Sequence, residues 1–96
     1  MILVEARIKC NPGRRDDFIR EAQPVIAATR KEKGNLCYDL FKSIEDENLL
    51  LYYERWESRD ALNGHIGSEH MKTWSRKRMD IGLISVPAVV KIYDIA

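Results

Sequence analysis

The chain has 96 residues, of which 45% are hydrophobic and 32% charged, and its formal net charge is +1 at pH 7. This length allows a single domain over residues 1–96, and the composition is typical of a globular protein rather than a disordered or membrane protein. A net charge so close to zero gives no broad attraction to nucleic acid or to anionic lipid, so we expect neither as a partner.

The first part of the chain predicts a strand followed by a helix. Residues 2–10 alternate between apolar and polar side chains, which is typical of a strand with one buried face. After a turn over residues 11–13, apolar residues recur at helical spacing from residue 16 to residue 33. We expect Pro24 to kink this helix because it removes one backbone hydrogen bond, and Gly34 to cap its end.

The remainder predicts three more strands and two shorter helices. Residues 35–43 and 48–56 favour strands joined by a polar hairpin turn. Ser58 can cap a short helix, and Ser68 can cap a further helix that ends near residue 79. Residues 88–95 predict the last strand. The order is therefore β-α-β-β-α-β, the ferredoxin-like α+β sandwich.

The predicted strand over residues 48–56 is substantially apolar on both faces, so both faces need cover. The two helices of this arrangement normally cover only one side of the sheet. A second copy of the same sheet is the simplest cover for the other side, and we therefore expect a two-fold symmetric homodimer.

The start of the chain and its cysteines favour a cytoplasmic protein. The first ten residues, MILVEARIKC, lack the basic segment and cleavage site of a signal peptide, and no apolar run approaches the length of a membrane span. Cys10 and Cys37 have no C-x-x-C spacing, so we interpret them as free thiols in a reducing compartment.

Residues 34–74 carry a distinctive series of motifs: a glycine, a tyrosine four residues later, an acidic hairpin, E-x-W, a helix with Ala-Leu, and H-x-x-S-x-H. The residues concerned are Gly34, Tyr38, Glu54, Trp56, Ala61, Leu62, His65, Ser68 and His70. In this order they resemble the antibiotic biosynthesis monooxygenase-like family of dimeric α+β barrels. That family includes quinol and anthrone oxygenases, a signalling-molecule isomerase, haem-degrading enzymes and proteins of no known activity, so the fold alone does not decide the function.

The resemblance implies, as the leading interpretation, a monooxygenase without a cofactor that oxidises a small quinol-like or polyketide-like aromatic with O₂. Such an enzyme needs a base that deprotonates the substrate, and histidine has the unperturbed pKa nearest neutrality. We expect His70 or His65 to be this base. Of the two, we favour His70 for the substrate slot and His65 for ordering the loop between the short helices.

The substrate slot should lie under the helices and be largely apolar. Tyr52, Trp56 or Asn11 would donate hydrogen bonds to the substrate oxyanion. Met71 and Trp74 would line the slot together with Tyr52 and Trp56, and Tyr38 would lie either in the slot or at the dimer face. Glu54 shares its strand face with Trp56, and an arginine partner such as Arg7 or Arg78 would make this carboxylate structural.

No metal or haem is expected. His65 and His70 are five residues apart, unlike the i,i+4 pair of a zinc-binding helix. A break in the helix at Gly67 would let the two side chains converge. No third metal ligand, however, has a recognisable spacing from them. Haem-degrading relatives present an axial histidine about one turn after the S-x-H segment and an amide from the first strand. At the place of the axial histidine this chain has Trp74-Ser75, and residues 4–7 of its first strand include no amide side chain. Neither requirement for haem is therefore met.

Two alternatives stay open beside the oxygenase. One is an isomerase of a small phosphorylated or carbonyl metabolite, which would use the same enolate chemistry. The other is a non-catalytic ligand-binding module of the same fold. The histidines favour an enzyme, because a purely structural slot has no need of a group that titrates near neutrality.

Overall fold

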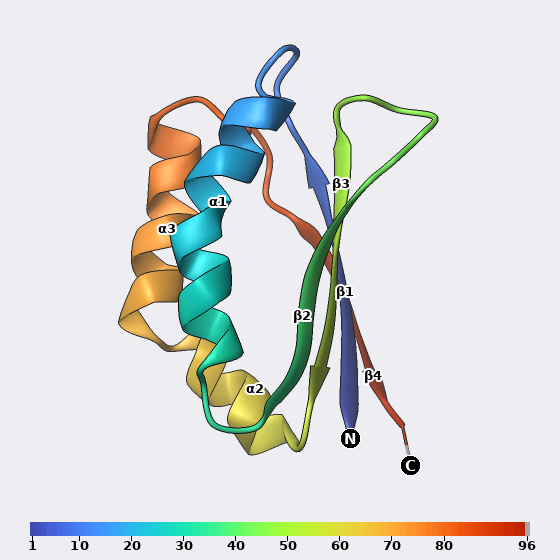
Figure 1. Cartoon of the computed structure of the whole chain (residues 1–96), viewed down its shortest axis with the longest axis vertical. Helices are drawn as coiled ribbons and strands as arrows, with labels where there is room; N and C mark the ends of the chain where they lie inside the picture. Colours follow the sequence, from blue (N-terminus) through green and yellow to red (C-terminus); the bar gives the residue numbers. More distant parts are fainter. Residues whose placement is uncertain (96) are drawn as a thin grey trace.

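The protein is a four-stranded antiparallel sheet with all its helices on one side (Figure 1). The computed structural model describes residues 1–95; Ala96, which the sequence analysis includes in the single domain, lies outside the described residues. The elements are β1 (Ile2–Lys9), α1 (Arg15–Arg30), β2 (Asn35–Lys42), β3 (Leu49–Trp56), α2 (Arg59–Ile66), α3 (Glu69–Asp80) and β4 (Val89–Asp94). The strand order is β2-β3-β1-β4, and α2 and α3 together take the place of the second helix. The predicted ferredoxin-like α+β fold is confirmed.

The core is formed by alternate residues of β1 and β3, as the sequence pattern predicts. From β1 and the residue that follows it, Ile2, Val4, Ala6, Ile8 and Cys10 are buried; from β3, Leu50, Tyr52, Glu54 and Trp56 are buried. The facing helices add Phe18, Ala22, Ile26, Leu62 and Trp74. A strand that is buried on one face places every second side chain under the helices, so this parity decides which residues can reach a site there.

The chain passes close to α2 at Gly34, and this explains a difference from the predicted helix. Helix α1 runs through Pro24 and ends at Arg30, three residues before the predicted end, with Lys31 as its C-cap. Gly34 therefore does not cap the helix. It has a φ of +86°, and a Cβ atom there would lie 2.5 Å from the Cβ of Ala61. Glycine is thus needed for both the left-handed backbone and the close approach of α2.

Helices α2 and α3 begin where the sequence predicts, and the turn between them positions the two histidines. The Ser58 hydroxyl accepts a hydrogen bond from the backbone N–H of Ala61, and the Ser68 hydroxyl accepts one from that of Met71. Gly67 is the C-cap of α2. His65 and His70 consequently lie on either side of this turn, one at the end of α2 and the other at the start of α3.

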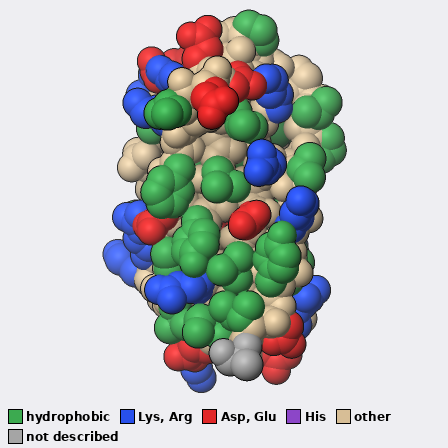
Figure 2. Space-filling view, turned by 90° about the vertical axis from the view of Figure 1, so that its right-hand side faces the viewer, with side chains coloured by type: hydrophobic (Ala, Val, Ile, Leu, Met, Phe, Trp, Pro, Cys, Tyr) green, Lys and Arg blue, Asp and Glu red, His purple; other side chains and the backbone are tan. Residues whose placement is uncertain are grey.

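The other side of the sheet carries no helix. Figure 2 shows hydrophobic side chains gathered across the middle of this face, with charged side chains mainly around them. Among the apolar residues on it, Phe41 is 51% exposed, Val89 60% and Tyr93 43%. We call this surface the open sheet face; its residues include Leu3, Phe41, Leu49, Leu51, Tyr53, Val89 and Tyr93. In the described part of the chain, every helix is too short or too polar to cross a membrane.

Candidate active site

A cavity of about 370 Å³ lies between the helix-facing side of the sheet and helices α2 and α3. This volume falls within the range of small-molecule sites. Most of its wall is apolar and comes from Val4, Ala6, Ile8, Leu62, Ile66, Met71, Ala88, Val90 and Ile92. Its polar wall residues are Tyr38, Tyr52, Glu54, His65, Lys72, Ser75 and Arg78. We call this space the central cavity.

His65 lies in the wall of the central cavity and is held there by Glu32. The residue is buried, and its Nδ1 lies 2.6 Å from Oε2 of Glu32, which stands just after α1. Burial lowers the pKa of His65, and the hydrogen bond to Glu32 opposes that effect. The imidazole is therefore neutral near pH 7. Since Nδ1 donates its proton to the carboxylate, Nε2 is the nitrogen left free to accept one.

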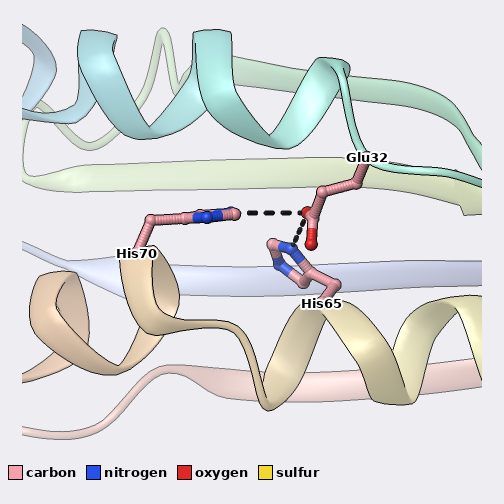
Figure 3. A group of neighbouring side chains, drawn as sticks. All are labelled: Glu32, His65 and His70. Carbon is pink, nitrogen blue, oxygen red and sulfur yellow. Dashed lines mark hydrogen bonds and ion pairs between the residues drawn. The ribbon is translucent and has the colours of Figure 1, made fainter.

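His70 approaches the same carboxylate from the other side but does not line the central cavity (Figure 3). Its Nε2 lies 3.5 Å from Oε2 of Glu32, 3.4 Å from Oγ of Ser68 and 3.5 Å from Oγ1 of Thr29. The side chain is 30% exposed. The sequence interpretation favours His70 for the slot, whereas the structure has His65 in the cavity wall. His65 also orders the loop between the two short helices, because its carbonyl accepts hydrogen bonds from the backbone N–H and the hydroxyl of Ser68.

Glu54 brings a second titratable group to the cavity wall. The side chain is 6% exposed, and its Oε1 accepts a hydrogen bond of 3.0 Å from the indole Nε1 of Trp56. Burial raises the pKa of this carboxyl to about 7, against the opposing effect of the indole hydrogen bond. Among residues 1–95 neither Arg7 nor Arg78 forms an ion pair with it, so the structural partner that the sequence suggests is not found.

Two hydrogen-bond donors in the cavity wall have no acceptor within residues 1–95. They are the hydroxyl of Tyr52 and the Nε of Arg78, and both atoms are buried. Burial raises the pKa of the Tyr52 phenol, as it does for Tyr38, so both hydroxyls keep their protons at pH 7. Buried donors without partners are costly, and a bound ligand with an acceptor oxygen would satisfy them.

Three of the expected site residues lie together in the central cavity wall besides His65: Tyr38, Tyr52 and Met71. Trp56 is fully buried behind the cavity, where it holds Glu54. Trp74 packs between the helices, with its ring 5.2 Å from that of Phe18 in an edge-to-face arrangement.

Asn11 lies away from the central cavity, beyond the end of β1. Its side-chain amide donates to the carbonyl of Gly82 at 3.0 Å, and its side-chain oxygen accepts from the hydroxyl of Ser85 at 2.7 Å. Both polar groups of this side chain are therefore occupied by the loop that leads to β4.

The sequence reasoning gave no site role to three residues: Glu54 and Arg78, which it considered only as a structural pair, and Glu32. Arg78 had a usable signal, because it shares one side of its helix with Met71 and Trp74 at helical spacing. Glu32 had none, since it stands in the charged run RKEK, which resembles a solvated surface. Glu32, His65 and His70 are also the residues within 1–95 that could hold a metal ion, with their ligand atoms all within 4.8 Å of one another.

Comparisons with known proteins agree with this architecture. Residues 1–77 match the model of the family described as "Antibiotic biosynthesis monooxygenase". The chain is 34% identical to "Putative monooxygenase YcnE" of Bacillus subtilis over 87 residues, which are 91% of this chain and 90% of YcnE. It is also 34% identical to "Putative monooxygenase Rv0793" of Mycobacterium tuberculosis over 92 residues, 95% of this chain and 87% of that protein.

Solved structures give the same result for the fold. The structure of Rv0793 superposes with a TM-score of 0.85 at 30% identity, covering 99% of this chain and 94% of that one. The structure of PA3566 from Pseudomonas aeruginosa has a TM-score of 0.80 at 32% identity, with 99% and 94% covered. The match to the family model and these identities over nearly whole chains show that this protein belongs to the antibiotic biosynthesis monooxygenase family.

Proposed function

We propose that this protein is a monooxygenase that deprotonates a small quinol-like or polyketide-like aromatic and oxidises it with O₂. The observation that carries the proposal is the central cavity, whose apolar wall contains His65 and Glu54. An apolar wall favours binding of an aromatic ring over binding of water or of a polar molecule. The pKa of the Glu54 carboxyl is raised to about 7, and the neutral imidazole of His65 can accept a proton, as a general base requires.

In this proposal His65 is the base that starts the reaction. Its Nδ1–H is held by Glu32, which fixes the tautomer so that Nε2 can take a proton from a phenol or an activated carbon. Removal of that proton leaves an electron-rich anion. The Tyr52 hydroxyl and the Arg78 Nε would donate hydrogen bonds to its oxygen, because neither has an acceptor among residues 1–95.

The oxidation then balances with the substrate and O₂ alone. The anion transfers one electron to O₂, the resulting radical pair forms a carbon–oxygen bond, and the peroxide formed loses water. A hydroquinone and one O₂ give a hydroxyquinone and one H₂O, so the substrate supplies all four electrons. Glu54 lies in the same cavity wall as His65 and would accept the second phenolic proton.

The open sheet face supports a homodimer as the working form. Its exposed apolar side chains form a patch rather than scattered single residues. A second copy of the chain would cover this patch through the same residues on both subunits, which is how two-fold interfaces are built. The central cavity lies on the opposite side of the sheet and would stay accessible.

One observation favours a second candidate, an isomerase of a small phosphorylated or carbonyl metabolite. Arg78 and Lys72 give the cavity wall two cationic side chains, with Lys72 exposed at its edge. Such a pair suits a phosphate or carboxylate group on the substrate. The base and the donors would serve equally for an enolate that is reprotonated rather than oxidised.

An oxygen electrode distinguishes these candidates. We expect protein-dependent uptake of one O₂ for each molecule of an accepted hydroquinone or anthrone, without release of hydrogen peroxide, above the autoxidation measured without protein. Absence of such uptake across the panel would contradict the oxygenase. Incorporation of deuterium from solvent into a carbonyl substrate would then identify the isomerase, and ligand binding without either reaction would identify a binding module.

A further inference from the structure

His70 is the one histidine that the proposed reaction does not use, and its surroundings are unusual. Its Nε2 has three polar neighbours, Glu32, Ser68 and Thr29, all at 3.4–3.5 Å. Each of these distances is at the upper limit for a hydrogen bond, so no single partner accounts for the position of the ring.

Glu32, His65 and His70 form what we call the His–Glu–His cluster. They come from three separate segments: the turn after α1, the end of α2 and the start of α3. Figure 3 shows that both imidazoles point toward the same carboxylate. The ligand atoms, one from each residue, all lie within 4.8 Å of one another. Two imidazoles and one carboxylate are a donor set that proteins use for zinc with one position left open.

Two of the three distances between ligand atoms in the cluster are near those around a coordinated ion, and the third is at most 4.8 Å. In a tetrahedral site with bonds of about 2.0–2.1 Å, neighbouring ligand atoms lie about 3.4 Å apart. Oε2 of Glu32 and Nε2 of His70 are already 3.5 Å apart. Oε2 of Glu32 and Nδ1 of His65 are 2.6 Å apart because a proton lies between them, and a metal in its place would separate them by less than about 1 Å more.

We propose that the His–Glu–His cluster binds a divalent transition-metal ion of the zinc class. Zn²⁺, Co²⁺ and Fe²⁺ suit two nitrogen donors and one oxygen donor, whereas Mg²⁺ and Ca²⁺ prefer oxygen donors. The hydroxyls of Ser68 and Thr29 lie 3.4 Å and 3.5 Å from Nε2 of His70, close enough to hold a water bound to the metal at its fourth position. Solvent reaches the cluster through His70, which is 30% exposed, and Glu32, which is 16% exposed.

Metal binding would change the protonation of His65, a consequence that rests on the proposed function. A metal on Nδ1 displaces the proton that this nitrogen shares with Glu32, and a neutral imidazole must then carry its proton on Nε2. That nitrogen could no longer act as a base. The bound ion would therefore inhibit the proposed oxidation, and its removal by a chelator would restore the oxidation.

Direct titration of the 96-residue chain without an affinity tag tests the site independently of any activity. We expect one Co²⁺ per chain, with the intense visible bands of four- or five-coordinate cobalt, and its displacement by Zn²⁺. Zn²⁺ should also raise the thermal midpoint of unfolding. His70→Ala and Glu32→Gln should each weaken binding by at least the roughly 10- to 100-fold that loss of an outer-shell partner costs. Glu45→Gln removes an exposed carboxylate from the hairpin and should leave binding unchanged.

The same experiment can overturn the proposal. Absence of Co²⁺ and Zn²⁺ binding would do so, as would binding that both variants retain at full strength or a cobalt spectrum of octahedral oxygen coordination. Circular dichroism of the metal-free variants shows whether they fold, and His70→Ala is the safer of the two because this side chain is partly exposed. Failure here would leave the oxygen-uptake result unaffected.

Discussion

The carboxylate of Glu32 and Nδ1 of His65 lie 2.6 Å apart, although the two residues are 33 positions apart in the chain. Both groups are largely withdrawn from solvent, with side chains 16% and 4% exposed. In the proposed reaction this contact fixes which nitrogen of His65 faces the substrate. The contact therefore connects the turn after α1 to the chemistry in the central cavity.

The first prediction concerns this pair. His65→Gln should lower kcat for an accepted hydroquinone by about 10²–10⁴-fold, the usual contribution of a general base. Glu32→Gln should lower kcat by about 10–100-fold with less change in KM, because it loosens the orientation of His65 without removing it. Oxygen uptake measures both effects.

His70→Ala is the matched control for that prediction. This side chain lies outside the central cavity, so the turnover of the metal-free protein should stay close to that of the wild type. A large loss in His70→Ala together with full activity in His65→Gln would reverse the assignment of the base.

The second prediction uses the raised pKa of Glu54. Unfolded, this carboxyl loses its proton near pH 4.5; folded, it keeps the proton up to about pH 7. The folded state binds more protons in that window, so the free energy of unfolding falls as the pH rises through it. Glu54→Gln should remove this loss and be more stable than the wild type above pH 7, by up to about 3 kcal/mol.

Urea unfolding at several pH values measures that difference. The lowered pKa of His65 acts in the opposite direction, since its stabilisation is lost as the pH falls below about 6.5. Subtracting the wild-type curve from that of Glu54→Gln removes this shared contribution. Glu45→Gln, which makes the same charge change on an exposed residue, should follow the wild type. Parallel curves for Glu54→Gln and the wild type would show that Glu54 has an ordinary pKa.

Most of the fold could be predicted because its signals are local. Strand alternation and helical spacing depend on neighbouring residues, and serines such as Ser58 and Ser68 cap helices through N–H groups three residues on. The predicted end of α1 was wrong because Gly34 was taken as a helix cap, a local role. A glycine is needed at this position because Ala61, 27 residues later on another helix, leaves no room for a Cβ atom.

The site could be predicted only in part, for the same physical reason. Strand parity correctly placed Tyr52 and Glu54 under the helices, and the turn at Gly67 allowed the histidines to converge. His65, the histidine in the cavity wall, is held by Glu32, and a carboxylate within a charged run has no pattern that shows where its side chain will point. The pKa of Glu54 likewise depends on burial by residues distant in the sequence.

The third prediction concerns the close approach at Gly34. Gly34→Ala should reduce the free energy of unfolding by about 2–4 kcal/mol, because it adds the left-handed backbone cost to a contact with the Cβ of Ala61. Gly13→Ala is the matched control: its φ is +78°, and no atom lies within 4 Å of the added Cβ. It should cost only the backbone part, about 1–2 kcal/mol. Equal losses in urea unfolding would show that α2 can move away from Gly34.

The fourth prediction tests the homodimer. Phe41 lies on the open sheet face opposite Leu51 of β3 and is 51% exposed, so Phe41→Asp should leave each chain folded while placing a charge in the proposed interface. Burying an unpaired carboxylate is unfavourable by several kcal/mol, and a two-fold interface would contain it twice. Sedimentation at micromolar concentration should therefore give a dimer for the wild type and a monomer for Phe41→Asp.

Ile44→Asp makes a similar change on the hairpin, where the side chain is 99% exposed, and should remain dimeric. A monomeric wild type would contradict the interface directly, while dissociation of both variants would place the contact at the hairpin instead of across the sheet.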